Sequence, residues 1–536
     1  MNRLPFVERG KAGDMDFSQS SQNQIKIIFV LYLIAVFSIF FLLIVRLFQL
    51  TVVKGSYYRR LSENNRIREI IIEPQRGTII DRNGTVLAEN IAADVHQNSS
   101  RILSTRRYTD GETNAHVIGY IQNADQKDFK DDSCLNKLQL GDKTGKKGIE
   151  KLFDCQLRGN SGKKLVETDA RGKLVRTLSI VEPVNGQTIK LALDETLQKK
   201  ALELLKNRKG SVIALKPQTG EILALASYPT FDPQVFEDSN IQRITDYFKN
   251  TDKPLFNRAT EGVYPPGSIF KLVVAGGALE EKKISGSTTV EDTGVIKAGQ
   301  ASFGNWYYLQ YGKTEGSVNI VKAIRRSNDI FFYKTGEVLG AEHIKTWAET
   351  FGYGKQTGLG LNEASGTVPS PFWKEEMLKE QWYLGDTYNY SIGQGYTLVT
   401  PLQTALATAV FANGGYLCKP QVLKRSNGDT QLNVTLPAYC HKLPLSSQTI
   451  STIREGMKEA CSTGGTGWPF FDFKPQVGCK TGTAESNNDA SPHAWFSVFA
   501  PFDKPEIAVT VVVEQAGQGS DIAAPVAKEL LKSYFK

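Results

Sequence analysis

The sequence predicts an α/β protein of the α+β type, in which a C-terminal domain has a central antiparallel five-stranded sheet flanked by helices. Two observations predict the sheet. Apolar strand-like runs at 211–215 and 222–226 flank a turn at 217–220, and three more such runs lie near the C-terminus. A third observation, the long apolar run at 27–45, predicts one transmembrane helix ahead of a mostly β domain.

The apolar run is long enough to cross a membrane. Residues 27–45 are apolar except for Ser38. A cleaved signal peptide is the alternative, but no small-x-small cleavage pattern follows in residues 46–50. We therefore expect a short, disordered cytoplasmic tail at 1–25, which is polar and has no apolar periodicity, and an uncleaved anchor at 26–46.

The sequence predicts the span more directly than it predicts the side of the membrane on which the rest of the chain lies. Basic residues flank the span on both sides, so charge alone does not orient it. Large domains translocate largely regardless of charge, and the sequence after the span has no second one. We expect a single-pass protein of the inner, or plasma, membrane whose bulk is extracytoplasmic, on the periplasmic side.

The composition is that of an ordinary globular protein. The chain has 536 residues, of which 40% are hydrophobic, and a formal net charge of +8. This length allows two or three domains. Outside the flanks of the span and residues 143–176 no basic stretch is concentrated, so no nucleic-acid partner is expected. The cysteines and histidines lack ligand spacing, so neither a metal nor another cofactor is expected.

The cysteines all follow the span, where disulfides can form. They are Cys134, Cys155, Cys418, Cys440, Cys461 and Cys479. We favour a pair between Cys134 and Cys155, because both lie in one small, Gly-rich, polar region. Cys479 is interpreted as an isolated buried thiol, and the sequence leaves the remaining pairing open.

The mostly β domain begins after the anchor. Residues 70–72 indicate a strand, and residues 76–88 indicate a hairpin with an Asn-Gly turn. The charged residues of this hairpin, Arg76, Asp81 and Arg82, are interpreted as a surface cluster that holds the hairpin to a neighbour, rather than as catalytic groups. Residues 96–190 are rich in turn formers between short polar and apolar alternations, which favours further strands.

We expect the C-terminal domain at 186–536, after the mostly β domain at 47–185, because the turn-rich sequence gives way there to longer helix and strand patterns. A capping signature at 194–198 opens a helix that runs through Leu205. Residues 272–415 are helix-rich. Three strands and a closing helix are then expected at 477–483, 494–499, 507–514 and 523–534.

A serine at a turn-to-helix junction is the first candidate for chemistry. Residues 264–272 read YPPGSIFKL, so Ser268 follows a turn and Lys271 lies three residues further on. Positions three apart share one face of a helix, and a helix N-terminus favours an alkoxide. Ser161 and Ser533 also satisfy the SxxK spacing, but only Ser268 precedes an apolar run. We expect Ser268 to be a nucleophile with Lys271 as its base.

The second candidate is Ser327, in the sequence Ser-Asn-Asp that ends at Asp329 and starts an apolar segment. By itself Ser327 reads as an ordinary helix N-cap. None of the histidines offers a defensible serine-histidine-acid arrangement, which favours a lysine-based site.

The third candidate is Lys480, at the head of a Lys-Thr-Gly-Thr run. The same tripeptide recurs at 143–145 and 334–336, but only Lys480 lies in a strand context. The period of two places Lys480 and Gly482 on one face of that strand. A glycine there allows close approach of a substrate backbone, the hydroxyls of Thr481 and Thr483 suit a carboxylate, and the Thr483 N–H suits an oxyanion.

The three motifs together resemble those of the penicillin-recognising serine enzymes, in the same order and with similar spacing. More narrowly, the chain resembles a class B penicillin-binding protein, a D,D-transpeptidase that cross-links peptidoglycan and has a pedestal before its catalytic domain. The supporting segments are the N-terminal anchor, 76–84, 145–150, 217–224, 393–395 and 493–496.

One residue departs from the usual pattern of that family. The second motif ends in Asp329, where most relatives have asparagine. This feature is similar to the elongation-type subgroup, penicillin-binding protein 2, more than to the septal type, which stays the alternative. A carboxylate at this position would also stabilise a protonated Lys271 or Lys480.

The resemblance implies an acyl-enzyme on Ser268, formed from peptidoglycan stem peptides and inhibited covalently by β-lactams. It implies that Ser327 and Lys480 relay a proton. It also implies a membrane glycosyltransferase partner of the shape, elongation, division and sporulation family. An SxxK-type β-lactamase would resemble only the C-terminal domain, and a noncatalytic β-lactam sensor would need a larger cytoplasmic part. The stem-peptide chemistry and the acceptor amine are not encoded in the motifs.

Overall fold

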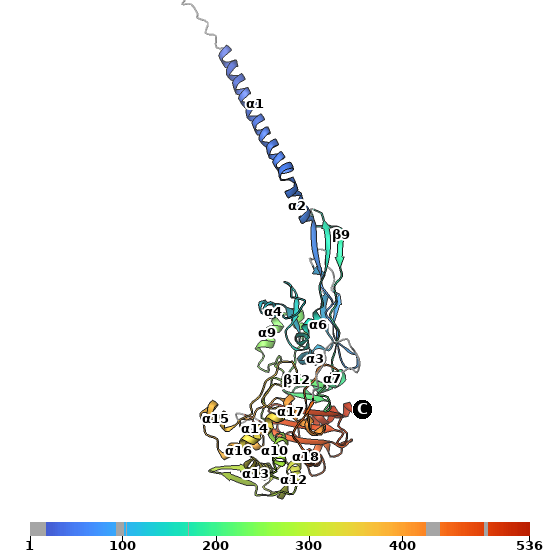
Figure 1. The fold of residues 1–536 in the computed structure, drawn as a ribbon, viewed down its shortest axis with the longest axis vertical. Coiled ribbons are helices and arrows are strands. Elements are labelled where there is room, and N and C mark those ends of the chain that lie inside the picture. Colours follow the sequence, from blue (N-terminus) through green and yellow to red (C-terminus); the bar gives the residue numbers. More distant parts are fainter. Residues whose placement is uncertain (1–17, 93–100, 103, 170, 425–439, 487–490) are drawn as a thin grey trace, which may run out of the picture. The chain divides into compact units, whose positions relative to one another are not determined.

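The computed structural model describes residues 18–92, 101–102, 104–169, 171–424, 440–486 and 491–536 (Figure 1). The chain forms two compact units, which we describe separately. The first consists of Met1–Ile72, Gln97–Ile102 and Gly162–Glu182. The second consists of Glu73–His96, Leu103–Ser161 and Pro183–Lys536.

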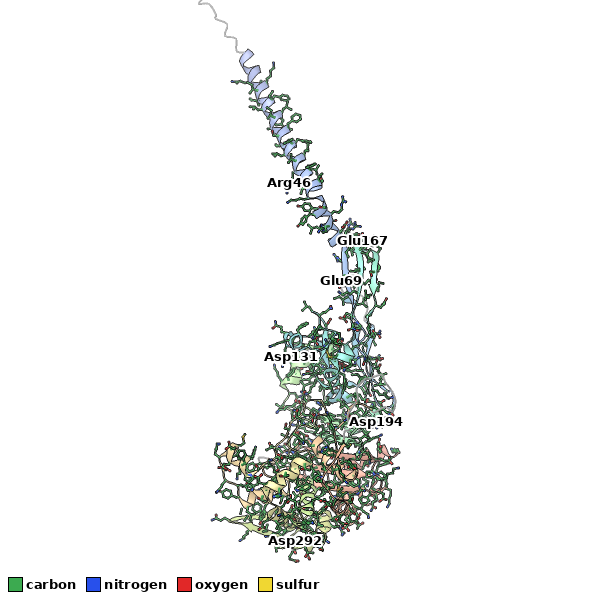
Figure 2. All side chains as sticks on the ribbon, viewed as in Figure 1. Arg46, Glu69, Asp131, Glu167, Asp194 and Asp292 are labelled. Atoms are coloured by element: carbon green, nitrogen blue, oxygen red, sulfur yellow. A yellow bond between two sulfur atoms is a disulfide. The ribbon has the colours of Figure 1, made fainter. Side chains whose placement is uncertain are left out.

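The first unit begins with a long apolar helix. Helix α1 (Ser18–Phe48) continues through a short π-helical segment (Gln49–Val53) and is followed by α2 (Gly55–Arg66). Within Gln24–Val53, the most apolar window of 18 residues has a mean hydropathy of 3.2 and none of it is buried, so its side chains project from the helix (Figure 2). This helix contains the anchor predicted at 26–46.

The predicted tail is only partly described by the structure. Its residues 18–25 are helical, contrary to the expectation of an unstructured segment, because no proline or glycine interrupts the chain between Ser18 and the apolar run. Residues 1–17 lie outside the described residues.

The rest of the first unit is a sheet in the order β4-β1-β8-β9. Its strands are β1 (Ile67–Ile72), β4 (Arg101–Ile102), β8 (Gly162–Thr168) and β9 (Leu174–Val181). Strand β1 contains the strand predicted at 70–72 and pairs antiparallel with β8.

The second unit starts with the predicted hairpin. Its strands belong to a sheet in the order β10-β2-β3-β5, with β2 (Ile79–Ile80), β3 (Val86–Ala92), β5 (Ser104–Tyr108) and β10 (Ile189–Lys190). The hairpin turn contains Gly84, whose φ of +96° favours glycine. The Asn-Gly turn is therefore confirmed.

Short helices lie between these strands, where turn-former composition did not predict them. They are α3 (Gly111–Ile118), α4 (Gln126–Asp131), α5 (Gly148–Leu152) and α6 (Asp154–Arg158), with a small pair of strands, β6 (Ile121–Asn123) and β7 (Lys143–Gly145). A capping box between Asp125 and Asp128 opens α4, and this signal is visible in the sequence.

Arg76 and Asp81 of the hairpin are buried and Arg82 is partly buried, contrary to the predicted surface cluster. Glu150 is fully buried and accepts hydrogen bonds from Arg76 Nε at 2.6 Å and Arg106 Nε at 2.8 Å. Arg76 also reaches Asp154, and Asp81 accepts from backbone N–H groups of its own turn. The partners of Arg76 come from a distant part of the chain, which the local sequence does not reveal.

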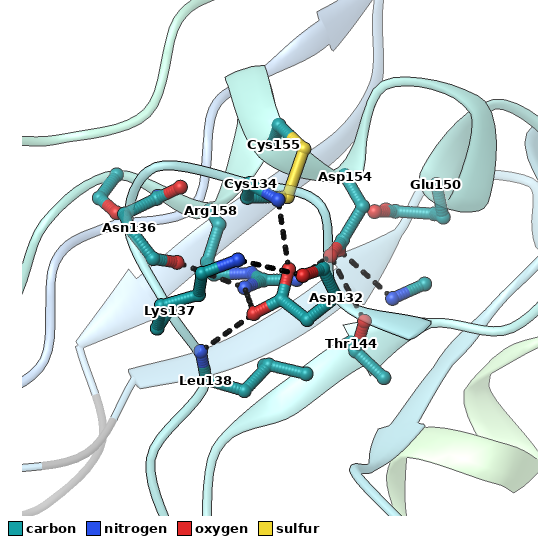
Figure 3. Close-up of a disulfide and its surroundings, with 12 residues drawn as sticks. Asp132, Cys134, Asn136, Lys137, Leu138, Thr144, Glu150, Asp154, Cys155 and Arg158 are labelled. Atoms are coloured by element: carbon teal, nitrogen blue, oxygen red, sulfur yellow. Dashed lines mark hydrogen bonds and ion pairs between the residues drawn. A yellow bond between two sulfur atoms is a disulfide. The ribbon is translucent and has the colours of Figure 1, made fainter. Parts of the chain in front are cut away.

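The predicted Cys134–Cys155 disulfide is confirmed (Figure 3). It joins the loop after α4 to helix α6. Beside it, Asp132 accepts from the N–H groups of Cys134 and Leu138 and from Arg158 Nη1 at 3.1 Å. The disulfide and this carboxylate hold the loop on the same short helix.

The interpretation of Cys479 as an isolated thiol is wrong, because it pairs with Cys461. Cys479 lies on the face of its strand opposite to Lys480, where it meets the end of helix α18 (Ser447–Ala460). The third disulfide, Cys418–Cys440, joins β17 (Tyr416–Cys418) to β18 (Cys440–Lys442).

The five-stranded antiparallel sheet of the C-terminal part is confirmed. Its order is β12-β11-β21-β20-β19, and every neighbouring pair is antiparallel. The strands are β11 (Gly210–Leu215), β12 (Ile222–Tyr228), β19 (Gly478–Ala484), β20 (His493–Ala500) and β21 (Ile507–Val513). Figure 1 shows the green strands of residues 210–228 beside the red strands of the C-terminus.

Alternate residues of these strands face two helical layers. Val212 and Ala214 belong to a core that includes residues of α7 (Glu195–Leu205) and α19 (Ala523–Tyr534). Ile213 and Leu215 belong to the other core, with residues of α10 (Lys271–Glu280) and α17 (Pro401–Ala412). The sheet is thus buried on both faces, as its nearly continuous apolar strands indicate.

The helix-rich segment is also confirmed. Besides α10 and α17 it contains α11 (Trp306–Tyr311), α12 (Ile320–Arg326), α13 (Asp329–Leu339), α14 (Ala341–Thr350), α15 (Pro371–Leu378) and α16 (Leu384–Ser391), with short strands β13 (Thr289–Asp292), β14 (Val295–Ala298), β15 (Ala301–Gly304) and β16 (Gly316–Asn319). Helices α8 (Gln234–Glu237) and α9 (Ile241–Lys249) precede it.

Candidate active site

Ser268 lies on a 3₁₀ turn (Gly267–Ile269) directly before α10. Gly267 has a φ of +54°, and its N–H donates to the Gly393 carbonyl at 3.0 Å. A Cβ at position 267 would lie 2.8 Å from the Thr483 carbonyl oxygen. Only glycine allows this turn to sit against β19, which places Ser268 at the edge of the sheet.

Lys271 points away from solvent, and its amine contacts the second motif. The side chain is fully buried, and Nζ donates to Asp329 Oδ1 at 2.6 Å and to the Ser327 carbonyl at 2.8 Å. Among the described residues Ser268 Oγ has no hydrogen-bond partner. The charge of Asp329 therefore holds the Lys271 amine against the second motif.

Ser327 lies in the bend between α12 and α13, with a left-handed φ of +54°. It is not the N-cap of α13, because Asn328 Oδ1 accepts from the Phe331 N–H. The hydroxyl of Ser327 lies between two amines, 2.8 Å from Lys480 Nζ and 3.3 Å from Lys271 Nζ. One hydroxyl thus connects the first and third motifs.

Asp329 is held in place by residues that sequence reasoning missed. Its Oδ2 accepts from the Trp306 N–H at 2.8 Å, and its own N–H donates to Asn305 Oδ1. Buried Asp292 accepts from Asn305 Nδ2 at 2.8 Å and Asn328 Nδ2 at 2.9 Å. No motif in the sequence marks Asp292 or Asn305.

The third motif lies on β19, at the edge of the five-stranded sheet. Lys480 is fully buried, and its Nζ donates to Ser327 Oγ and to the Thr481 carbonyl. A Cβ on Gly482 would meet Trp495 at 2.8 Å and Ile269 at 3.1 Å. This glycine therefore allows the Ser268 turn to approach β19 closely, while the predicted approach of a substrate backbone stays a prediction.

A cleft of about 790 Å³ opens over these residues. Ser268, Ser327 and Asp329 line it together with Thr481 and Thr483. Aromatic side chains from α11 and from the loop after α18 form further walls, namely Trp306, Tyr311 and Trp468. The candidate nucleophile and the candidate carboxylate-binding hydroxyls thus face one space.

The two lysines share a single carboxylate. Burial lowers the pKa of Lys271, although the nearby charge of Asp329 opposes this effect. Burial lowers the pKa of Lys480 well below its usual value, the charge of Lys271 lowers it further, and Asp329 again opposes. Because one negative charge faces two buried amines, a neutral amine is favoured beside Ser327.

The other copies of the Lys-Thr-Gly tripeptide and of the SxxK spacing lie away from these residues. Residues 143–145 form β7, Lys334 lies on α13, and Ser533 lies on α19. None of them lines the cleft among the residues that the structure describes. The structure thus brings together the residues of the three predicted motifs and leaves their duplicates apart.

Comparison with known proteins gives matches over most of the chain. Residues 210–532 match the family model of the penicillin-binding protein transpeptidase domain, and residues 99–191 match that of the penicillin-binding protein dimerisation domain. The peptidoglycan D,D-transpeptidase MrdA of Haemophilus influenzae is 31% identical, over 92% of this chain and 89% of that protein. MrdA of Acinetobacter baumannii is 32% identical, over 87% of this chain and 81% of that protein.

Solved structures agree with these relatives. Pseudomonas aeruginosa PBP2 in complex with WCK 5153 has a TM-score of 0.75 and 31% identity, over 87% of this chain and 96% of that one. PBP2 of Helicobacter pylori in complex with MreC has a TM-score of 0.74 and 28% identity, over 88% of this chain and 99% of that one.

Proposed function

Because this chain belongs to the penicillin-binding protein transpeptidase family and is an elongation-type serine D,D-transpeptidase, we propose that it cross-links peptidoglycan stem peptides through Ser268. The observation that supports these roles best is the Ser327 hydroxyl, which lies within hydrogen-bonding distance of both Lys271 and Lys480. It provides a path for a proton from the nucleophile to a leaving group.

In the proposed acylation step, Ser268 Oγ attacks the carbonyl carbon of the penultimate D-alanine of a pentapeptide stem. Lys271 accepts the hydroxyl proton, and the backbone N–H groups of Ser268 and Thr483 stabilise the oxyanion. Ser327 and Lys480 pass a proton to the nitrogen of the terminal D-alanine as the C–N bond breaks. Asp329 stabilises the charge that Lys271 gains.

The substrate is held by its terminal carboxylate. In its protonated form Lys480 supplies positive charge, and the hydroxyls of Thr481 and Thr483, which line the cleft, donate to the carboxylate oxygens. Gly482 supports this arrangement by allowing the Ser268 turn to approach β19. In the second step an amine from a neighbouring stem attacks the acyl-serine ester, which forms the cross-link and frees Ser268.

The septal, β-lactamase and noncatalytic alternatives are not favoured. Curated relatives over 92% of the chain are peptidoglycan D,D-transpeptidases, and their similarity extends well beyond the C-terminal domain. Covalent inhibition by β-lactams at Ser268 follows from the same acylation chemistry. A role in cell elongation and shape fits the relatives named MrdA and PBP2.

A partner in the shape and elongation machinery fits two solved relatives, PBP2 with MreC and a peptidoglycan synthase complex that coordinates polymerization and crosslinking. We propose specifically a membrane glycosyltransferase of the shape, elongation, division and sporulation family. The apolar helix supports a single-pass membrane anchor at 26–46, with a cytoplasmic tail at 1–25. The pedestal at 47–185 and the transpeptidase domain at 186–536 would then lie on the periplasmic side of the inner membrane.

Labelling with a fluorescent penicillin tests the nucleophile. We expect Ser268→Ala to abolish covalent labelling, because it removes the only atom that forms the acyl bond. Ser533→Ala is the matched control, since Ser533 satisfies the same spacing on α19, and it should label like the wild type.

Intact-mass spectrometry over hours completes the test. A single persistent adduct on the peptide that contains Ser268 supports the transpeptidase. Labelling that survives Ser268→Ala contradicts the assignment, and an adduct lost within seconds with hydrolysed drug accumulating would indicate a β-lactamase.

A further inference from the structure

A loop between α18 and β19, residues 461–468, forms one wall of the cleft. Gly465, Thr466 and Trp468 from this loop line the same space as Ser268. Thr466 Oγ1 lies 2.7 Å from Thr481 Oγ1, so the two hydroxyls share a hydrogen bond. We infer that Thr466 is a further positioning residue, which orients the Thr481 hydroxyl toward the substrate carboxylate. This inference rests on the proposed role of Thr481.

Either hydroxyl can donate in the shared hydrogen bond, and the proposed role of Thr481 requires that Thr466 is the donor. Each hydroxyl has one hydrogen to donate. If Thr481 donated to Thr466, it would have no hydrogen left for a carboxylate. When Thr466 donates instead, the Thr481 hydrogen is free to point into the cleft, and the two bonds strengthen each other.

The loop that carries Thr466 is fixed from the side of β19. The Cys461–Cys479 disulfide ties the start of the loop to the residue before Lys480. A Cβ at Gly467 would lie 2.8 Å from Cys479 Sγ and 2.9 Å from Cys461 Sγ, so the residue after Thr466 packs directly on the disulfide. The Gly467 N–H also donates to the Ala460 carbonyl at 2.8 Å.

The same loop is fixed from the side of the second motif. Arg325 Nη2 donates to the Thr463 carbonyl, and Arg326 Nη1 donates to the Gly464 carbonyl, each at 2.9 Å. Arg326 directly precedes Ser327. The loop therefore links the second and third motifs, and the disulfide is the covalent part of that link.

The test uses the full-length protein in detergent and two probes, benzylpenicillin and its methyl ester. The ester keeps the reactive ring but lacks the free carboxylate. We expect Thr466→Val to lower the second-order acylation rate with benzylpenicillin by about tenfold, the scale of a hydrogen bond to a charged group. The rate with the ester should change by less than about twofold. Thr466→Ser, which keeps the hydroxyl, should retain the wild-type rates.

The disulfide has its own matched pair of variants. Cys461→Ser with Cys479→Ser should reproduce the selective loss with benzylpenicillin. Cys418→Ser with Cys440→Ser removes a disulfide between β17 and β18 and should leave the ratio of the two rates unchanged.

Two results would overturn the inference. One is a Thr466→Val protein with unchanged rates, and the other is an equal loss with both probes, which would indicate a merely structural role. Retention of the benzylpenicillin rate without the Cys461–Cys479 bond would overturn the role of the disulfide. A wild-type protein that does not prefer benzylpenicillin over the ester would instead refute the proposed carboxylate site, and the inference with it.

Discussion

Asp329 places one negative charge against Lys271 at 2.6 Å, beside a second buried lysine. In the proposed mechanism this charge has two effects. It stabilises Lys271 once the amine has taken the proton of Ser268, and it makes the neutral form of the amine less favourable beforehand. The balance between these effects sets the pH range in which the enzyme acylates.

The residue-scale prediction concerns the pH dependence of acylation by penicillin. The rate should rise with pH as the accepting amine loses its proton. Asp329→Asn removes the charge that opposes the lowering of both lysine pKa values. Both pKa values should then fall further, so the rise in rate should move to lower pH.

The measurement is the second-order acylation rate across the acidic and neutral range. Asp521→Asn is the control, because Asp521 lines the cleft but accepts from Trp468 rather than from either lysine. In the Asp521 variant, the acylation rate should rise at the same pH as in the wild type. A rise that stays in place or moves to higher pH in the Asp329 variant would contradict the electrostatic argument.

The sequence indicated which residues come together at the cleft better than it indicated their contacts. Ser268, Lys271, Ser327 and Lys480 could be singled out as candidates because their motifs occur in a fixed order. Their contacts depend on residues without a motif. Asp292 acts through Asn328, which lies 36 residues further along the chain, so no local pattern indicates it.

At the scale of elements, the 3₁₀ turn before α10 determines where the nucleophile lies. Gly267→Ala would introduce a side chain at a φ of +54° and a Cβ 2.8 Å from the Thr483 carbonyl oxygen. We expect the acylation rate to fall by at least about tenfold and the free energy of unfolding to fall by roughly 1–2 kcal/mol. Penicillin acylation and chemical denaturation measure the two effects.

A control variant at a second glycine separates the effect of backbone strain from the effect on the position of Ser268. Gly299 has a φ of +63°, but nothing lies within 4 Å of a Cβ there. Gly299→Ala should cost similar stability and leave the acylation rate unchanged. If the Gly267 variant acylates at the wild-type rate, the turn does not position Ser268 in the way proposed.

Element prediction succeeded where apolar periodicity extended over several residues. The helices at 195–205 and 523–534 begin and end where the sequence placed them, and the five strands differ by one or two residues. The helices α3 to α6 were missed, because five to eight residues show too little periodicity to distinguish a helix from a turn.

At the scale of the whole molecule, the residues that form the cleft and their partners all belong to the second unit. A chain that lacks residues 1–53 should therefore remain in solution without detergent and acylate within about twofold of the full-length rate, since no contact of the cleft is removed. Ultracentrifugation and acylation by penicillin measure the two outcomes. A truncated chain that still needs detergent would show that the apolar helix is not its main attachment to the membrane.

The three disulfides each join one cysteine to the next in the chain, with separations of 21, 22 and 18 residues. In the proposed topology the segment after the anchor would cross the membrane in the order of the sequence, so its cysteines would reach an oxidant in that same order. Each new thiol then finds its native partner as the most recent unpaired one. With that topology, oxidation during export would yield the native connectivity directly, and no later exchange between wrongly joined cysteines would be required.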